Sequence, residues 1–198
     1  HWYLSTDIGC AFMALDGLSQ YYERTSDARV KRLLEEMIAV FRQIDFVGAS
    51  MQTHASLSAA RGILRFYEST GDESFLRTAE ELFALYCREG MTENYANDNW
   101  FDRPGWTEPC AVIDSYMLAS GLFGDTGDSR YLLIAQRIFY NAMGFAQRSN
   151  GGFGCDNCVG AQEPFVHPKE EYFEAYWCCT MRGGEGLARM VQYSVMTE

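Results

Sequence analysis

"TGDESF", residues 70–75, returns with small changes as "TSDARV" at 25–30 and as "TGDSRY" at 126–131. Each copy is typical of a helix end that is followed directly by a helix start. Gly71 and Gly127 suit the left-handed position just after a helix, and the aspartate that follows suits the N-cap of the next one. The copies are 45 and 56 residues apart, which is one helix pair each. The repeat therefore predicts a succession of α-hairpins.

Apolar residues recur at helical spacing through almost the whole chain, which favours helices over strands. Strand signals are weak, and only 152–166 is expected to hold a short hairpin. The predicted helices span 6–24, 28–44, 53–69, 73–88, 108–123, 129–147 and 184–196.

Three and a half hairpins at this period define the expected architecture. Helix pairs of this kind form either a solenoid or a closed toroid, and an (α/α)6 toroid needs about six pairs. We predict an all-α fold, a helical-hairpin (α/α) toroid that makes a partial (α/α)6 barrel. Residues 1–198 would then be a single domain or a fragment of a longer (α/α)6 catalytic domain. The open inner face favours either a longer chain or a homo-oligomer that closes the ring.

Composition narrows the class of partner. The 198 residues carry a net charge of −11, and such a chain repels phosphate backbones, so no nucleic-acid partner is expected. No apolar run reaches the roughly 18 residues that span a bilayer, so no membrane partner is expected either. Free thiols favour a reducing compartment, but a bound metal protects thiols elsewhere. The bacterial cytoplasm and periplasm therefore both stay open.

Two long loops break the repeat, at 89–107 and 148–184. Both are polar, contain glycine and are rich in aromatic residues. In a helical toroid the loops at one end carry the site, because the helices hold them in place. We expect the chemistry to lie where these two loops converge.

The stretch "WTEPC", 106–110, pairs a carboxylate with a thiol. Thr107 is a plausible N-cap, and Pro109 fits the first turn of a helix. Residues two apart point to opposite sides inside a helix, so Glu108 and Cys110 could share a metal only at a helix start. That is where the sequence places them.

The stretch "YWCCTMRGGEG", 176–186, sets Cys178 and Cys179 side by side. Adjacent side chains in a helix diverge by about 100°. The glycines at 183, 184 and 186 predict irregular backbone after the pair. Two thiolates, a third cysteine and a carboxylate make a tetrahedral zinc site, so Zn²⁺ is the expected cofactor.

Other cysteines leave alternatives open. "GCDNC", 154–158, is a C-x-x-C motif, and Cys155 and Cys158 could join the adjacent pair in a structural site with four sulfur ligands. They could instead form a disulfide or stay thiols, and the adjacent pair could be buried packing or a vicinal disulfide. Cys10 and Cys87 lie within apolar helical patterns and are expected to be packing residues.

The order of these motifs resembles the β-L-arabinofuranosidase group, glycoside hydrolase family 127 and its relatives. The usual pattern has E-T-C at a helix start, then R-x-x-Y-N-G, then Cys-x-Cys-Cys leading into a helix. Here the chain reads Glu108-Pro109-Cys110, then "RIFYNAM" at 137–143, then the adjacent cysteines and "LAR" at 187–189. The match runs through most of the chain in order, which makes it more specific than any single motif.

The resemblance implies roles for residues of this chain. In that family a carboxylate and three cysteines bind zinc, and the first cysteine of the adjacent pair is the nucleophile. Carried over, Cys178 attacks the anomeric carbon of a carbohydrate, and Glu108, Cys110 and Cys179 complete the metal site. The acid/base glutamate lies shortly before E-x-C, which points to Glu93.

The resemblance also implies a sugar-binding set. A histidine that opens a helix binds sugar hydroxyls in that family, and His54 in "MQTHASLSAARG" fits it. Apart from the resemblance, Tyr95, Trp100, Trp106 and His167 are further candidates, which could either stack on a sugar ring or simply pack the loops.

Departures from the family pattern bear on substrate. The cysteine expected two places before the adjacent pair is Tyr176, and "TMRGG" at 180–184 replaces the usual Pro-Pro-Asn. This indicates a divergent member, whose substrate could be another plant cell-wall sugar. Two rival functions stay open: a non-catalytic helical module with a four-cysteine zinc site, and a toroidal glycosidase or lyase that uses carboxylates alone, with Asp98, Asp102 and Glu93 as candidates.

Overall fold

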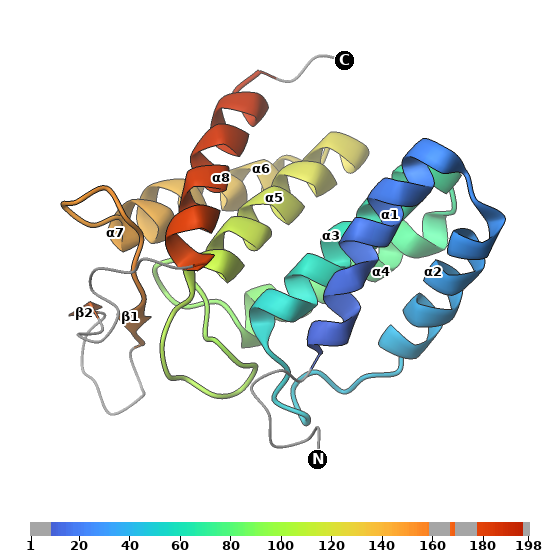
Figure 1. Cartoon of the computed structure of the whole chain (residues 1–198). Coiled ribbons are helices and arrows are strands. Elements are labelled where there is room, and N and C mark those ends of the chain that lie inside the picture. The colour runs from blue at the N-terminus through green and yellow to red at the C-terminus, as the bar shows by residue number, and fades with distance from the viewer. Residues whose placement is uncertain (1–8, 159–166, 169–177, 196–198) are drawn as a thin grey trace.

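The computed structural model describes residues 9–158, 167–168 and 178–195, and these are helical almost throughout (Figure 1). The elements, in chain order, are the 3-10 helix η2 (Cys10–Met13), α1 (Ala14–Thr25), α2 (Ala28–Phe41), α3 (Thr53–Thr70), α4 (Glu73–Glu89), α5 (Pro109–Thr126), α6 (Ser129–Arg137), the π-helix η3 (Ile138–Met143), α7 (Gly144–Ala146), β1 (Asp156–Asn157), β2 (His167–Pro168) and α8 (Cys178–Tyr193).

The helices alternate between two rows. Helices α1, α3, α5 and α8 form the first row, in which each contacts the next. Helices α2, α4 and α6 form a second row, and each packs against the helix that precedes it in the chain. The described residues thus build three hairpins and the first helix of a fourth, as the turn repeat predicts. This is the arrangement of an (α/α) toroid.

The repeated turns have the predicted geometry. Asp27, Asp72 and Asp128 each accept a hydrogen bond from the backbone N–H two residues on, at 2.8–2.9 Å, and so cap α2, α4 and α6. Gly71 and Gly127 end the preceding helices with φ of 70° and 69°, a conformation that costs glycine little. Each hairpin is therefore closed by local chemistry.

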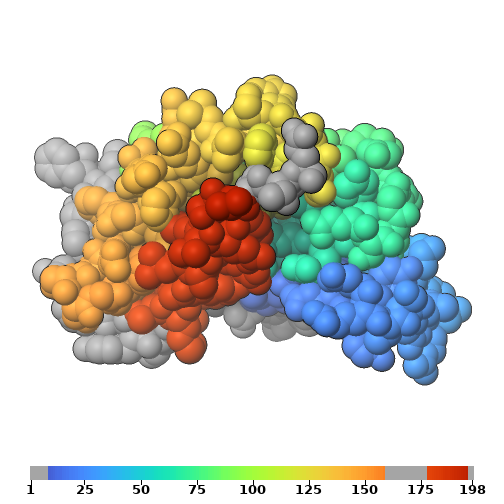
Figure 2. All heavy atoms as spheres, turned by 90° about the horizontal axis from the view of Figure 1, so that it is seen from above, coloured from blue at the N-terminus to red at the C-terminus, as the bar shows by residue number. Residues whose placement is uncertain are grey.

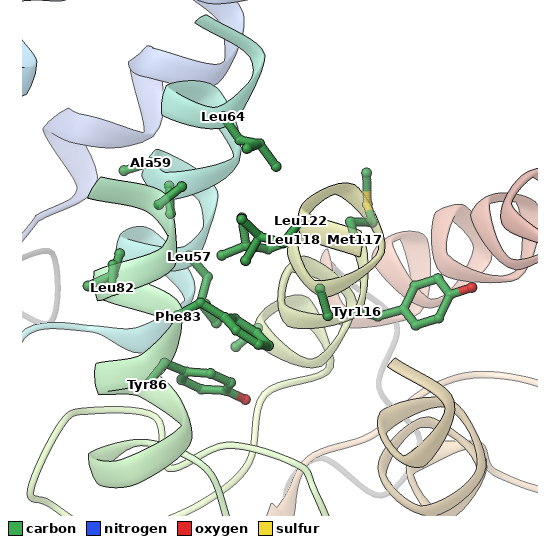
Figure 3. Close-up of a cluster of buried hydrophobic side chains, with 14 of the residues drawn as sticks. Leu57, Ala59, Leu64, Leu82, Phe83, Tyr86, Tyr116, Met117, Leu118 and Leu122 are labelled. Atoms are coloured by element: carbon green, nitrogen blue, oxygen red, sulfur yellow. The ribbon is translucent and has the colours of Figure 1, made fainter. Parts of the chain in front are cut away.

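The core lies between α3, α4 and α5 (Figure 3). Leu57 from α3 and Leu118 and Leu122 from α5 meet Phe83 from α4, and all are nearly inaccessible to solvent. Each such side chain contributes about 1.5–3 kcal/mol through burial. Tyr86 also reaches this core, and its hydroxyl donates to the carbonyl of Ala96 at 3.0 Å. The core thereby fixes the loop that precedes α5.

Several predicted boundaries are wrong. The last helix begins at Cys178, six residues earlier than predicted, and α2 ends at Phe41 instead of residue 44. The predicted helix 129–147 is interrupted by η3, and the first helix opens as a 3-10 turn at Cys10. The short hairpin pairs β1 with β2, so its second strand starts just after the predicted 152–166 range. Residues 6–8, 159–166 and 196 of these predictions lie outside the described part of the chain.

The irregular backbone that the glycines predict after Cys179 is not found, because α8 runs through them and they allow it to pack closely. A Cβ at Gly183 would lie 2.1 Å from the Phe153 ring, and one at Gly186 would lie 2.2 Å from Ile113. The absent side chains let α8 approach α5 and the loop between α7 and β1, which contains Phe153. Close packing therefore offsets the poor helix propensity of glycine.

We predict opposite effects at two neighbouring glycines. Gly183→Ala should lower the free energy of unfolding by about 1–3 kcal/mol, because the methyl group overlaps Phe153. Gly184→Ala should raise it by about 0.5–1 kcal/mol, because a Cβ there meets nothing within 4 Å and alanine is the better helix former. Urea unfolding of both variants measures this difference, and equal midpoints would contradict the packing of α8.

One side of α8 faces solvent. Figure 2 shows this helix (red) at the surface, and its Met181, Leu187 and Val191 are exposed. In the part of the chain that the structure describes, the main packing partner of α8 is the first-row helix α5. Among the same residues, no helix is both long and apolar enough for a bilayer crossing.

Candidate functional site

The fold brings three helix starts together. The first-row helices α3, α5 and α8 begin on the same side of the molecule, where the loops before α5 and after α7 also lie (Figure 1). Backbone hydrogen bonds join these segments: Thr53 N–H donates to the carbonyl of Asn99 at 3.0 Å, and Thr107 N–H donates to that of Asp156 at 2.7 Å. The described parts of the two long loops therefore converge, as the sequence predicts.

Glu108, Cys110, Cys178 and Cys179 meet at this place. Their four ligand atoms lie within 4.8 Å of one another. Glu108 is the N-cap of α5, with φ −132° and ψ 113°, so its side chain is not yet constrained by the helix. Its backbone N–H donates to Asn97 Oδ1 at 2.9 Å, which fixes this start. The prediction that Glu108 and Cys110 share a helix start is thus confirmed.

The donor set fits a zinc ion. Three thiols and one carboxylate suit this metal. Glu108 is 7 % exposed, and its Oε2 accepts no hydrogen bond from the residues that the structure describes. Burial raises the pKa of Glu108 to about 7. A buried oxygen without a donor costs free energy, and a cation beside it would remove that cost.

The thiols of this cluster shift one another's pKa values. Hydrogen bonds from Cys110 and Cys155 lower the pKa of Cys179. The same two hydrogen bonds raise the pKa of Cys110 and of Cys155. Cys110 and Cys179 are buried, whereas Cys178 is exposed. Of the four residues, Cys178 is thus the one that solvent or substrate can reach.

The structure excludes both disulfides that the sequence left open for the cysteines. None of the seven cysteines is joined in a disulfide, so neither a vicinal disulfide nor a Cys155–Cys158 disulfide is formed. Cys158 is directed elsewhere, with its Sγ 3.7 Å from the carbonyl oxygen of Asn97. Cys10 and Cys87 are half-buried, and Cys87 packs against the core. Tyr176, which stands where the family pattern has a further cysteine, lies outside the described residues.

A buried charge network lies one helical turn beyond the cluster, and sequence reasoning missed it. Asp114 is fully buried and accepts hydrogen bonds from His54 Nδ1 at 2.6 Å, from Arg61 at 2.5 Å and from Arg182. Asp114 follows Cys110 by four residues, and Arg182 follows Cys178 by four. Residues four apart share a helix face, so the Asp114–Arg182 pair aligns the first turn of α8 with that of α5.

The sequence does contain a signal for this network. Asp114 is the lone charge in the apolar run "PCAVIDSYMLASG", 109–121, and a carboxylate in such a run needs cationic partners. His54 and Arg61 are seven residues apart, which puts them on one face of α3. Nothing in the local pattern tells which helix supplies the partner of Asp114.

His54 should titrate above its ordinary range. Burial alone would lower its pKa, but the hydrogen bond to Asp114 and the charge of that carboxylate outweigh burial and raise it above 6.5. The His54–Asp114 pair therefore makes its full contribution to the free energy of unfolding below about pH 6.5, the pKa of histidine in the unfolded chain. That contribution is lost as the pH rises through the higher pKa that His54 has in the folded protein. Titration of the His54 imidazole by NMR measures the shift, with His54→Gln to assign the signal. A pKa at or below 6.5 would contradict it.

The other predicted sugar-binding residues lie around this end of the molecule. Arg137 donates to the Tyr95 hydroxyl and stacks over its ring, 5.3 Å from the centroid. Trp100 packs edge-on against Trp106, with ring centroids 5.7 Å apart. Trp106 also packs against the buried Cys110, Cys155 and Cys179.

Glu93 and His167 are less defined. Glu93 is exposed in the turn after α4. The pKa of Asp98 is raised mainly by burial and to a lesser extent by the charge of Glu93. His167 pairs through its backbone with Asn157 in the β1–β2 ladder. The acid/base role of Glu93 and the sugar-binding roles of His54, Tyr95, Trp100 and His167 stay predictions.

Solved structures place the fold in a class. The GH76A α-1,6-mannanase from Salegentibacter sp. HEL1_6 superimposes with a TM-score of 0.67 and 17% identity over 81% of this chain and 48% of that one. A glycoside hydrolase gives 0.70 and 15% over 90% and 37%, and a sugar epimerase from a ruminal bacterium gives 0.68 and 12% over 94% and 54%. These identities show the fold alone: an (α/α) toroid of the kind found in carbohydrate-active enzymes. The chain spans about half the length of these structures or less.

The family follows from the sequence itself. Residues 52–192 match the GH127 catalytic domain of β-L-arabinofuranosidase. That match covers most of the chain and includes both helix starts of the cysteine cluster, so the chain belongs to this glycoside hydrolase family. The comparison of this chain with curated proteins found no match.

Proposed function

We propose that this chain belongs to the catalytic domain of a retaining glycoside hydrolase, similar to β-L-arabinofuranosidases, with Cys178 as its nucleophile. The observation that carries the proposal is the gathering of Glu108, Cys110, Cys178 and Cys179 within 4.8 Å, with Cys178 the exposed member. The expected substrate is a carbohydrate of plant cell-wall type.

Zn²⁺ would be held by these four residues. When bound, it would keep the sulfurs deprotonated at neutral pH and keep them from pairing as disulfides. Without the ion, burial raises the pKa of Cys178 and the hydrogen bond with Cys179 raises the pKa of Cys110. The helix starts offset part of this effect. Cys178 is the first residue of α8 and Cys110 the second of α5, where the helix dipole favours a thiolate.

The chain's own residues would carry out both steps. Glu93 donates a proton to the leaving glycosidic oxygen while Cys178 Sγ forms a bond to the anomeric carbon and the C–O bond breaks. Glu93, now a carboxylate, takes a proton from water. The water oxygen bonds to the anomeric carbon, and Cys178 leaves as a thiolate. Two inversions retain the anomeric configuration.

His54 and the loop aromatic residues would hold the sugar. The hydrogen bond from His54 Nδ1 to Asp114 fixes the ring, so Nε2 remains to contact a hydroxyl group. Tyr95 and Trp100, in the loop before α5, would offer aromatic faces to the sugar ring.

Hydrolysis of p-nitrophenyl β-L-arabinofuranoside, followed by NMR of the first anomer released, tests the proposal. We expect a retained anomer, and loss of turnover after chelation or thiol alkylation. Turnover that survives both treatments would favour the carboxylate-only mechanism. If Cys178→Ser lowered thermal stability in a protein that turns over none of a panel of glycosides, the four-residue site would be structural.

A further inference from the structure

A fourth thiol lies against the proposed metal site. Cys155 Sγ is 3.9 Å from Cys179 Sγ, and Cys155 packs with Cys110 and Cys179 in one buried cluster. The exposed fractions of these three residues are 2 %, 1 % and 6 %. Cys155 belongs to no motif of the family pattern described above, and the mechanism does not use it.

The distance between the two sulfurs is compatible with a shared zinc ion. Zinc binds thiolates at about 2.3 Å in a tetrahedral arrangement, which puts two such sulfurs about 3.8 Å apart. The 3.9 Å between Cys155 and Cys179 agrees with this value. Cys155 is therefore placed as a ligand would be, although it lies outside the group of four.

The backbone on both sides of Cys155 is fixed to the segments that carry the other ligands. Asp156 exchanges two hydrogen bonds with Thr107, the residue before Glu108: its carbonyl accepts at 2.7 Å and its N–H donates to Oγ1 at 2.9 Å. Phe153 N–H donates to Thr180 Oγ1 in the first turn of α8 at 3.2 Å. Arg148 donates to the Cys155 carbonyl at 2.9 Å.

Five donors thus surround a metal that takes four ligands. Of the five, Glu108, Cys110, Cys155 and Cys179 are buried, and Cys178 is exposed. In the proposed reaction Cys178 becomes a thioether when it bonds to the sugar. A thioether is neutral and binds zinc less well than a thiolate does.

We propose that Cys155 is a reserve ligand, which takes the coordination position that Cys178 leaves. This rests on the proposed function. While Cys178 is bonded to the sugar, the sulfur of Cys155, which lies 3.9 Å from that of Cys179, would take its place as the third sulfur ligand, and its thiol proton would pass to water. The charge of the ligand set is unchanged, and the exchange reverses when Cys178 leaves the sugar as a thiolate.

X-ray absorption at the zinc edge, which counts sulfur ligands, tests this without an activity assay. The purified protein should hold one zinc with three sulfurs. Cys178→Ala, which lacks the exchanging sulfur, should still hold zinc with three, because Cys155 replaces it. Cys178→Ala/Cys155→Ala should hold two sulfurs and bind zinc at least tenfold more weakly. Cys178→Ala/Cys158→Ala is the matched control and should behave like Cys178→Ala.

The sulfur count of Cys178→Ala alone decides the proposal, even where the double variant does not fold. Two sulfurs in Cys178→Ala, with three in the unaltered protein, would overturn the role of Cys155 and leave the proposed function standing. An unaltered protein that binds no zinc would overturn both.

Discussion

Replacing Cys178 by alanine is expected to reduce the rate of glycoside hydrolysis by about 10⁴-fold or more. Removal of a nucleophile from an enzyme that works through a covalent intermediate has effects of this size or larger. The fold should survive, because Cys178 is exposed and supplies little of the core. Initial rates with an activated glycoside, together with the circular dichroism of the variant, measure both expectations.

Cys158→Ala is the control for this experiment. It removes a buried thiol from the same end of the molecule, but from outside the group of four ligands. We expect it to keep most of the activity. If Cys178→Ala kept a tenth of the rate or more, Cys178 would not be the nucleophile.

Asp114→Ala is expected to destabilise the protein by about 3–5 kcal/mol. The change leaves His54, Arg61 and Arg182 around a buried site without their shared carboxylate, and unpaired buried charges carry costs of this size. Burial would raise the pKa of Asp114, but these partners hold it below its usual range, so the carboxylate is charged at neutral pH. Chemical denaturation measures the loss.

Asp72→Ala gives the comparison for Asp114→Ala. It also removes an aspartate, but one that only caps α4, and the loss of such a cap costs about 1 kcal/mol. Equal losses in the two variants would mean that the Asp114 network adds little to stability.

The fold could be predicted because its signals are local. Each hairpin turn carries its own N-cap aspartate, and two carry the left-handed glycine, so the repeat alone gives the order and pairing of the helices. Helix ends were less predictable where tertiary contacts decide them. The start of α8 is the clearest case, because the close approach of Phe153 to Gly183 is a tertiary contact that the local glycine pattern does not show.

The candidate site divides in the same way. Glu108 and Cys110 could be paired from sequence, because their spacing and the proline between them mark a helix start. The role of Asp114 could not be assigned, because its partners His54 and Arg182 lie 60 and 68 residues away. Contacts at that separation depend on how the first-row helices pack, which no local pattern specifies.

The zinc content of the purified protein tests the central claim most directly. We predict one zinc per chain, bound by three sulfurs and one oxygen, with affinity at least tenfold weaker in Cys110→Ser and unchanged in Cys158→Ser. A protein without stoichiometric zinc, or one that loses zinc in Cys158→Ser and keeps its affinity in Cys110→Ser, would contradict the account.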